Sequence, residues 1–367
     1  MSLNRGDNLD DFIKGLYLSE CFFQERGLPI IKRYYPDLKF SAGLLGYGSD
    51  VLGYDDNIST DHMWGPRFYL FLIEEDIDNK DKLLECFETN LPYEYKGYSV
   101  NFSKPNMNDN GVRCPEFISS GKVSPLIWIY TIKDFINEYL GLYPCDNFQW
   151  LSLSEHRLLG FTSGKLFVDM LNLSKIRDEF SFYPLDVKLY LIASQWSLIA
   201  EEQAFVKRCS DSTDELGSRI VCTRIVERLM RLCFIYKNKY APYSKWFGTG
   251  FKYLTIDDKI KNELYMALSA NTIEERELHI VNAQVHVAKL HNESYITEVF
   301  KINVHNYFDR DIKVLSLDTL IEMIKNEIKD DRLKNIPFIG SLSQIGNFVE
   351  LSDNPKYVWN VQSLYRY

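Results

Sequence analysis

The chain has 367 residues, of which 46% are hydrophobic and 14% aromatic, and its formal net charge is −9. A chain of this length exceeds the usual size of one hydrophobic core, so we expect two domains. The negative charge argues against a protein whose main surface binds nucleic acid or an anionic membrane, because such a surface needs an excess of lysine and arginine.

The N-terminus and the cysteines predict a soluble, cytoplasmic protein. Residues 1–7 contain no apolar signal region, and no stretch approaches 18 uninterrupted apolar residues. The seven cysteines are scattered and form no C-x-x-C pair, a pattern typical of free thiols in a reducing compartment. We therefore expect neither a membrane nor a nucleic acid as a partner.

The first 140 residues mix helical and strand patterns. The spacing of apolar residues predicts helices over 9–26, 29–35, 80–89 and 132–140. Apolar runs predict strands over 40–45, 68–73 and 125–131, and an edge strand over 93–102. We expect residues 1–140 to form an α+β domain, a mixed sheet with flanking helices.

After residue 141 the pattern becomes helical. Long helical patterns separated by turn residues cover 186–208, 214–238, 256–270, 273–292 and 317–328. No strand pattern of comparable length appears in this half. We place the domain boundary near 141–150 and expect residues 141–367 to form an α-helical bundle.

The glycine-rich stretch between the first two predicted strands, residues 46–67, is the strongest candidate for a functional site. It combines glycines, small hydroxyl residues and carboxylates, and it leads directly into a strand. The pair Gly48 and Ser49 at a strand-to-helix turn would let backbone N–H groups and a hydroxyl approach a triphosphate, while downstream carboxylates hold Mg²⁺. This arrangement suits phosphoryl or nucleotidyl transfer. The alternative is a plain turn between two strands.

Several other catalytic motifs are missing from the sequence. It contains no G-x-x-x-x-G-K-[ST], G-x-S-x-G or H-E-x-x-H, and the glycines at 46, 48 and 53 miss the G-x-G-x-x-G spacing. A P-loop enzyme, an α/β-hydrolase, a zinc protease and a Rossmann oxidoreductase are therefore disfavoured.

The glycine-rich stretch resembles the signature of the polymerase-beta nucleotidyltransferase superfamily. In that signature Gly-Ser is followed by a pair of aspartates on the next strand and by a third carboxylate on a later strand. The chain is also similar, nearly end to end, to a bacterial nucleotidyltransferase-like family of unknown function with a helical C-terminal half. The segments that carry this resemblance are 16–20, 55–67, 183–187, 195–196, 201–205, 214–218 and 240–248.

The resemblance implies transfer of a nucleoside monophosphate from an NTP to a hydroxyl of a small molecule or protein, with Mg²⁺ as cofactor. It places Gly48, Ser49 and Asp50 at the nucleotide and Asp61 on the metal as a catalytic residue. The second metal-binding aspartate would fall where the chain has Met63, and a thioether is a poor ligand for Mg²⁺.

The third carboxylate has its best counterpart at Trp128, which also cannot bind a metal. Three hypotheses follow. The first is an enzyme in which nearby carboxylates replace the missing ligands. The second is a catalytically degenerate nucleotide-binding or regulatory protein. The third is a vestigial cleft joined to a helical interaction module. The candidate replacement carboxylates are Asp50, Asp55, Asp56, Glu74 and Glu75.

Two further residues of this stretch have open roles. Arg67 begins the second strand, and it either contacts a phosphate at the nucleotide site or fixes the turn by pairing with Asp55 or Asp56. His62 is either a proton shuttle or a histidine held by ordinary hydrogen bonds.

Three residues of the helical half are also candidates. In nucleotidyltransferases that modify antibiotics, a helical domain supplies a carboxylate base for the acceptor hydroxyl, and the resemblance gives this role to Glu202 or Asp214. The alternative is a solvated glutamate and a helix-capping aspartate. Lys245 either reaches a phosphate or packs its stem on the neighbouring aromatic rings.

Overall fold

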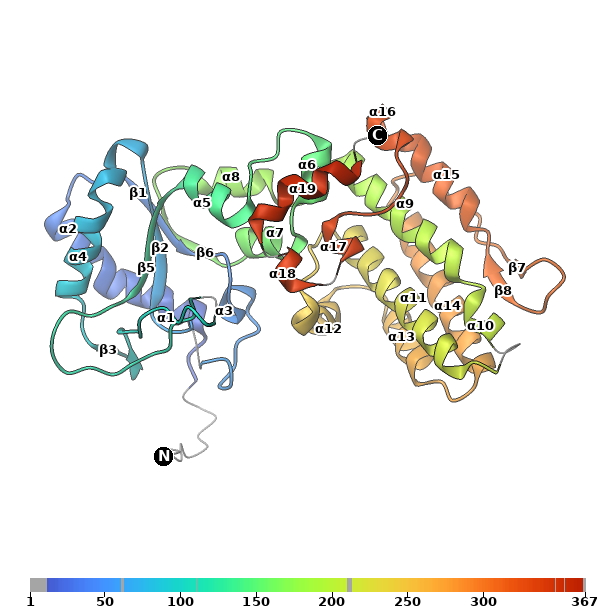
Figure 1. Ribbon diagram of the computed structural model, residues 1–367, viewed down its shortest axis with the longest axis horizontal. Coiled ribbons are helices and arrows are strands. Elements are labelled where there is room, and N and C mark those ends of the chain that lie inside the picture. The colour runs from blue at the N-terminus through green and yellow to red at the C-terminus, as the bar shows by residue number, and fades with distance from the viewer. Residues whose placement is uncertain are drawn as a thin grey trace. The chain divides into compact units, whose positions relative to one another are not determined.

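The computed structural model (Figure 1) describes residues 12–60, 63–109, 111–209, 213–346, 348–352 and 354–365. The chain forms two compact units. The first contains Met1–Leu142 and Arg157–Ser181, and the second contains Tyr143–His156 and Phe182–Tyr367. None of the described helices has both the length and the hydropathy that a membrane span requires.

A four-stranded mixed sheet forms the centre of the first unit. Its strands lie in the order β5-β2-β1-β6 and are β1 (Phe40–Leu44), β2 (Arg67–Leu72), β5 (Leu126–Thr131) and β6 (Lys165–Asp169). Strand β1 is antiparallel to both β2 and β6, whereas β2 and β5 are parallel. The mixed α+β character predicted for this half is confirmed, as are the strands predicted over 40–45, 68–73 and 125–131.

Strand β6 is a strand that the sequence pattern did not predict. It lies inside the stretch expected to be a helical bundle, yet Ser41 of β1 pairs with Asp169 and Leu44 pairs with Lys165. Its five residues are too few for period or apolar content to separate a strand from a helix. The boundary predicted near residues 141–150 therefore misses Arg157–Ser181, which lie with the first unit.

The two faces of the sheet are covered by different helices, because successive strand residues point to opposite sides. Phe68 and Leu70 of β2 pack in one core with residues of the helices α1 (Gly15–Phe22), α2 (Leu28–Tyr34) and α4 (Lys80–Asn90). Tyr69 and Phe71 point to the other face, where both rings contact Phe135 of α5 (Ile132–Leu140). Figure 1 shows α2 and α4 on one side of the strands and α5 on the other.

The helices of the first unit are α1 (Gly15–Phe22), which continues as the π-helix η1 (Phe23–Gly27) into α2 (Leu28–Tyr34), then α3 (Ser49–Leu52), the 3₁₀ helix η2 (Glu74–Asn79), α4 (Lys80–Asn90), α5 (Ile132–Leu140) and α8 (Leu173–Glu179). Two of them, α4 and α5, agree closely with their predicted ranges, the helices predicted over 9–26 and 29–35 form one continuous helical stretch, and α3, η2 and α8 were not predicted. The predicted edge strand over 93–102 is instead a separate short hairpin, formed by β3 (Glu94–Tyr95) and β4 (Tyr98–Ser99).

The second unit is mainly helical. Its long helices are α9 (Leu185–Glu202), α11 (Glu215–Tyr236), α13 (Asp258–Ser269), α14 (Ile273–Glu293) and α15 (Leu317–Glu327). Helix α9 packs on α11 and α15, and α14 packs on α11 and α13. A buried chain of hydrogen bonds joins three of these helices. Trp196 Nε1 donates to the Tyr236 hydroxyl (2.8 Å), which lies 3.1 Å from His291 Nδ1.

Shorter elements complete the described chain. They are α6 (Asn147–Ser152), α7 (Glu155–Thr162), α10 (Phe205–Arg208), α12 (Ser244–Tyr253), β7 (Val304–Asn306), β8 (Lys313–Leu315), α16 (Asp331–Asn335), α17 (Leu342–Ile345), α18 (Val349–Ser352), α19 (Val358–Val361) and the 3₁₀ helices η4 (Pro355–Tyr357) and η5 (Gln362–Tyr365). Strands β7 and β8 form an antiparallel hairpin that the sequence pattern did not predict.

Candidate functional site

The glycine-rich loop connects β1 to the single turn of α3. The Gly46 N–H donates to the Gly160 carbonyl (2.9 Å), and a Cβ on Gly160 would lie 2.2 Å from the Gly46 oxygen. Gly48 has φ 127° and ψ 145°, a conformation that is essentially restricted to glycine. A Cβ at this position would lie 2.2 Å from Asp50 Oδ1 and 2.4 Å from Arg67 Nη2. Glycine is therefore required at 48 for both conformation and space.

Arg67 and Asp50 form a buried ion pair directly behind this loop. Arg67 Nη2 lies 2.7 Å from Asp50 Oδ1, Nε lies 3.1 Å from Oδ2, and Nη2 also donates to the Tyr47 carbonyl (2.9 Å). The exposed fractions of the two side chains are 0% and 1%. Burial acts to lower the pKa of Arg67, but the charge and hydrogen bonds of Asp50 outweigh it and raise this pKa.

This pairing corrects one prediction and gives Asp50 a definite partner. Arg67 pairs with Asp50, and not with Asp55 or Asp56 as the sequence analysis had proposed. The paired Asp50 has two oxygens engaged by one guanidinium in a bidentate geometry. Arg67 and Asp50, which were both predicted to contact the nucleotide, therefore stabilise the loop from its buried side.

Asp55 and Asp56 are likewise engaged in local structure. Asp55 is buried, and its Oδ2 accepts hydrogen bonds from the Gly15 N–H (2.7 Å) and from Trp64 Nε1 (3.2 Å). Asp56 accepts hydrogen bonds from the Ser59 hydroxyl and from two backbone N–H groups of the same turn. The Ser59 hydroxyl is the main cause of the lowered pKa of Asp56. Asp55 thus ties the loop to the start of α1, and Asp56 holds its own turn together.

Strands β2 and β5 carry no carboxylate. Strand β2 reads RFYLFL and β5 reads LIWIYT. Tyr69 and Trp128 pair in register on these two strands, and their rings stack with centroids 4.9 Å apart. Among the residues that the structure describes, no three histidine, cysteine, aspartate or glutamate side chains lie together as a metal site.

The one carboxylate in the sheet, Asp169 of β6, has a structural role. Its Oδ1 accepts hydrogen bonds from the Ser41 hydroxyl and the Leu173 N–H, both at 2.7 Å, and its Oδ2 accepts one from the Ser174 N–H at 2.9 Å. Burial acts to raise the pKa of Asp169, but these hydrogen bonds outweigh it and lower the pKa. Asp169 therefore ties β1 to the start of α8.

Glu74 and Glu75 lie at the wrong end of the sheet to replace a metal ligand. They follow the last residue of β2, and Leu72 pairs with Phe40 at the beginning of β1. The glycine-rich loop follows the other end of β1. Because the two strands are antiparallel, these glutamates and the loop are at opposite ends of the strands.

Met63 lies in the connection before β2 and not on the strand. Its φ is 50°, its N–H donates to the Arg113 carbonyl (2.9 Å), and its Sδ accepts from the Arg113 N–H (3.3 Å). The strand begins four residues later, at Arg67. Asp61 and His62, predicted as the metal ligand and a possible proton shuttle, lie outside the described residues.

Arg113 is a cation near the loop that the sequence analysis missed. Its guanidinium donates to the carbonyls of four residues and to the Ser124 hydroxyl, and none of these acceptors is charged. Burial raises the pKa of Tyr47, while the charges of Arg67 and Arg113 act to lower it. Arg113 stands in a polar loop with no periodic pattern, so nothing in the sequence singled it out.

The predicted site residues of the second unit have separate structural partners. Glu202 pairs with Arg224 (2.6 Å) and lies 3.8 Å from Arg228. Lys245 Nζ lies 5.1 Å from the centroid of the Trp246 ring. The Lys245 contact matches the alternative of a lysine packed on an aromatic ring. Glu202 is not the solvated glutamate of the other alternative, because its side chain is only 15% exposed and lies between two arginines.

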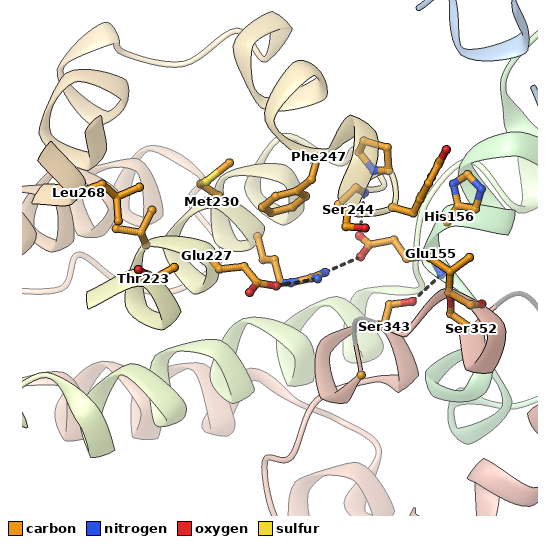
Figure 2. A pocket seen from close by; sticks show the side chains of 17 residues that line it. Glu155, His156, Thr223, Glu227, Met230, Ser244, Phe247, Leu268, Ser343 and Ser352 are labelled. Atoms are coloured by element: carbon orange, nitrogen blue, oxygen red, sulfur yellow. Dashed lines mark hydrogen bonds and ion pairs between the residues drawn. The ribbon is translucent and has the colours of Figure 1, made fainter. Parts of the chain in front are cut away.

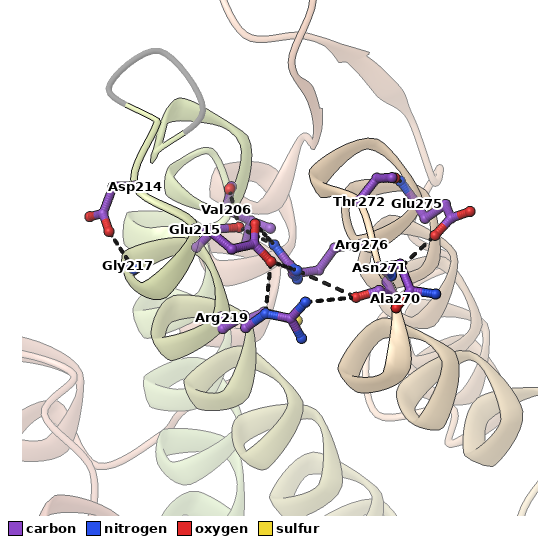
Figure 3. A network of polar contacts seen from close by, with 12 residues as sticks. Val206, Asp214, Glu215, Gly217, Arg219, Ala270, Asn271, Thr272, Glu275 and Arg276 are labelled. Atoms are coloured by element: carbon purple, nitrogen blue, oxygen red, sulfur yellow. Dashed lines mark hydrogen bonds and ion pairs between the residues drawn. The ribbon is translucent and has the colours of Figure 1, made fainter.

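Asp214 is the N-cap of α11. Its Oδ1 accepts a hydrogen bond from the Gly217 N–H at 2.8 Å. The next residue, Glu215, lies 2.5 Å from buried Arg276 and also binds Arg219, as Figure 3 shows. Arg276 and Arg219 lower the pKa of Glu215. This network fixes the start of α11, so the observed role of Asp214 is the capping alternative.

Comparison with known proteins gives a family match to part of the chain and a likeness to solved structures. Residues 150–247 match the family described as Domain of unknown function (DUF4037). The crystal structure of a nucleotidyltransferase-like protein from Exiguobacterium sibiricum is 10% identical, with 80% of this chain and 98% of that chain covered and a TM-score of 0.34. That TM-score is too low to carry an argument. No curated protein matches the chain.

Proposed function

We propose that the chain is a nucleotide-binding protein that keeps the glycine-rich loop of a nucleotidyltransferase-like unit without metal-dependent nucleotidyl transfer. One observation carries this proposal: Asp50 is committed to Arg67, and β2 and β5 offer no carboxylate. Metal-assisted phosphoryl transfer needs anionic oxygens that hold Mg²⁺ against the substrate phosphates. The described residues around the loop do not fit such a cation.

Nucleotide binding is supported by the donors that the loop offers. Among the described residues, none accepts a hydrogen bond from the backbone N–H groups of Gly48, Ser49 and Asp50. Consecutive N–H groups at a glycine-rich turn suit a phosphate group. Tyr47 and Trp128 are partly exposed beside this turn, with ring centroids 6.0 Å apart, and offer an aromatic surface to a base.

A transfer assay separates this proposal from the enzyme that the resemblance implies. The purified protein is incubated with labelled NTPs, Mg²⁺ or Mn²⁺, and hydroxyl-bearing small molecules or proteins. We expect no labelled product and no pyrophosphate, while calorimetric titration of the same sample detects NTP binding. Pyrophosphate release that Asp61→Asn abolishes would establish the transferase instead. Absence of binding to any NTP would reject both.

A further inference from the structure

A cavity of about 300 Å³ lies within the second unit. Its wall is formed by the start of α7, by α11, by the segments 241–247 and 343–352, and by Leu268 of α13. The volume is at the lower end of the range of sites that bind small molecules, so it suits a molecule with one ring and a short chain. None of these residues belongs to the proposed nucleotide site, so a proposal about the cavity and the proposed function can fail independently.

Three charged side chains of the wall hold one another. Arg231 Nε and Nη2 lie 3.1 Å and 3.0 Å from Glu227 Oε1, and Arg231 Nη1 lies 3.5 Å from Glu155 Oε2. Glu155 Oε1 accepts a hydrogen bond from the Ala241 N–H (3.0 Å). Arg231 and Glu227 also have other contacts within the chain. A charged ligand would therefore compete with partners that are already in place.

Arg228, the residue after Glu227 on α11, adds a further compensating charge. Burial lowers the pKa of Arg228, and the charges of Glu202 and Glu227 act in the opposite direction. Glu227 is thus compensated by the hydrogen bonds of Arg231 and by the charge of Arg228. Each of the three charged side chains in the wall has at least one partner of opposite charge.

Apolar side chains line one part of the cavity. Figure 2 shows Leu268, Met230 and Phe247 along one side, with Glu155 and Ser343 at the other end. The guanidinium carbon of Arg231 lies 5.2 Å from the centroid of the Phe247 ring, so this ring is held in place by a cation. An apolar group of a ligand would be buried favourably against this side of the cavity.

The hydroxyl of Ser343 is a hydrogen-bond donor at the polar end of the cavity. Its Oγ accepts a hydrogen bond from the Glu155 N–H at 2.9 Å, and none of the described residues accepts a hydrogen bond from the Ser343 hydroxyl. By contrast, the hydroxyl of Ser352, which also lines the cavity, donates to the Val349 carbonyl at 3.2 Å. Ser343 can therefore donate one hydrogen bond to an oxygen of a ligand.

We propose that this cavity binds a small neutral molecule that has an apolar ring and one oxygen that accepts a hydrogen bond, as in an aryl-alkyl ketone. The ring covers Met230 and Leu268, and the oxygen accepts from the Ser343 hydroxyl. A charged ligand is disfavoured, because it loses its water while the charged side chains of the wall keep one another as partners.

The test compares three probes of nearly the same shape on the full-length chain. They are benzylacetone, the primary amine formed from it by reductive amination, and phenylpropanoate, which are neutral, cationic and anionic at neutral pH. Calorimetric titration should give benzylacetone an affinity at least about tenfold higher than that of either charged probe, because each charged probe loses water without gaining a free partner.

Two matched pairs of variants locate the binding. Leu268→Trp narrows the cavity and should weaken benzylacetone binding about tenfold, whereas Leu278→Trp, at an exposed leucine of α14 outside the wall, should leave it unchanged. Ser343→Ala removes the donor and should weaken benzylacetone binding about threefold to tenfold. Ser352→Ala should leave it unchanged, because the Ser352 hydroxyl already donates to the Val349 carbonyl.

Four results would overturn the proposal. The first is a charged probe that binds as tightly as benzylacetone, and the second is no binding of any probe at millimolar concentration. The third is equal benzylacetone affinity in Leu268→Trp and Leu278→Trp, and the fourth is equal affinity in Ser343→Ala and Ser352→Ala. If Ser343→Ala does not fold, the two leucine variants still decide, because these leucines are 45% and 57% exposed and tolerate a larger side chain.

Discussion

The guanidinium of Arg67 holds both carboxylate oxygens of Asp50, at 2.7 Å and 3.1 Å, in a position from which water is excluded. A buried charge that loses its partner is costly, whereas replacing both partners by neutral groups costs much less. This pair fixes the backbone of the glycine-rich loop, since the same guanidinium also binds the Tyr47 carbonyl.

Removal of one partner should therefore destabilise the first unit strongly. We expect Arg67→Met to lower the free energy of unfolding by about 3 to 5 kcal/mol, because Asp50 is left buried and unpaired. The double variant Arg67→Met with Asp50→Asn should lose less than the sum of the two single variants. Urea unfolding measures all three changes. Strict additivity, or a single-variant loss below about 1 kcal/mol, would show that the pair does not brace the loop.

Gly48 and Gly53 form a matched pair for testing the loop. Both have positive φ, but a Cβ at 48 would collide with the Arg67–Asp50 pair, while nothing lies within 4 Å of a Cβ at 53. We expect Gly48→Ala to weaken nucleotide binding by at least about tenfold, and Gly53→Ala to cost only about 1 kcal/mol of stability through backbone strain. Equal nucleotide affinity in the two variants would place the binding site elsewhere.

The role of Asp214 can be tested with two substitutions. As the N-cap of α11 it should tolerate Asp214→Asn, because asparagine also accepts the Gly217 N–H, whereas Asp214→Ala should cost about 1 kcal/mol. Thermal unfolding of both variants gives the comparison. A catalytic base would show the opposite pattern in a transfer assay, with both variants inactive and stability unaffected.

Burial lowers the pKa of His291 to about 4. The unfolded chain, in which the pKa of histidine is near its ordinary value of about 6.5, then takes up the proton first as the pH falls. The stability that the neutral imidazole contributes is fully present above about pH 6.5 and is lost as the pH falls toward about 4. Between about pH 7 and about pH 5, this loss should reach about 2 kcal/mol.

The variant His291→Gln has no titrating group at this position. Between about pH 7 and about pH 5, its free energy of unfolding should therefore fall by about 2 kcal/mol less than that of the unmodified protein. Denaturant unfolding at both pH values gives the difference between the two proteins. Parallel pH profiles would mean that His291 titrates in the folded state as it does in the unfolded chain.

Much of the fold was predictable because its signals are local. The strands at 40–45, 68–73 and 125–131 are apolar runs bounded by turn residues, and α5 and α14 begin at the predicted residues. Strand β6 was missed because KLFVD is short and its pairing with β1 is a contact between residues far apart in the sequence.

The glycine-rich turn was predictable in its position along the chain, but the contacts around it were not. The glycine-rich turn stands where the sequence placed it. However, the position of the motif relative to β2 depends on how the connection over residues 53–66 folds, which no periodic pattern encodes. The strand starts at Arg67, so its first positions carry Arg67 and Tyr69, and the pairings of Arg67 with Asp50 and of Tyr69 with Trp128 arise only in the folded sheet.

The affinity for ATP with and without a divalent cation shows whether backbone donors or a metal ion hold the phosphates. Calorimetric titration of the full-length chain is carried out once with Mg²⁺ and once with EDTA, and repeated with Asp61→Asn. We expect dissociation constants that agree within about threefold in all cases, because backbone donors and not a metal hold the phosphates. An affinity that falls by more than about tenfold in EDTA or in Asp61→Asn would contradict it.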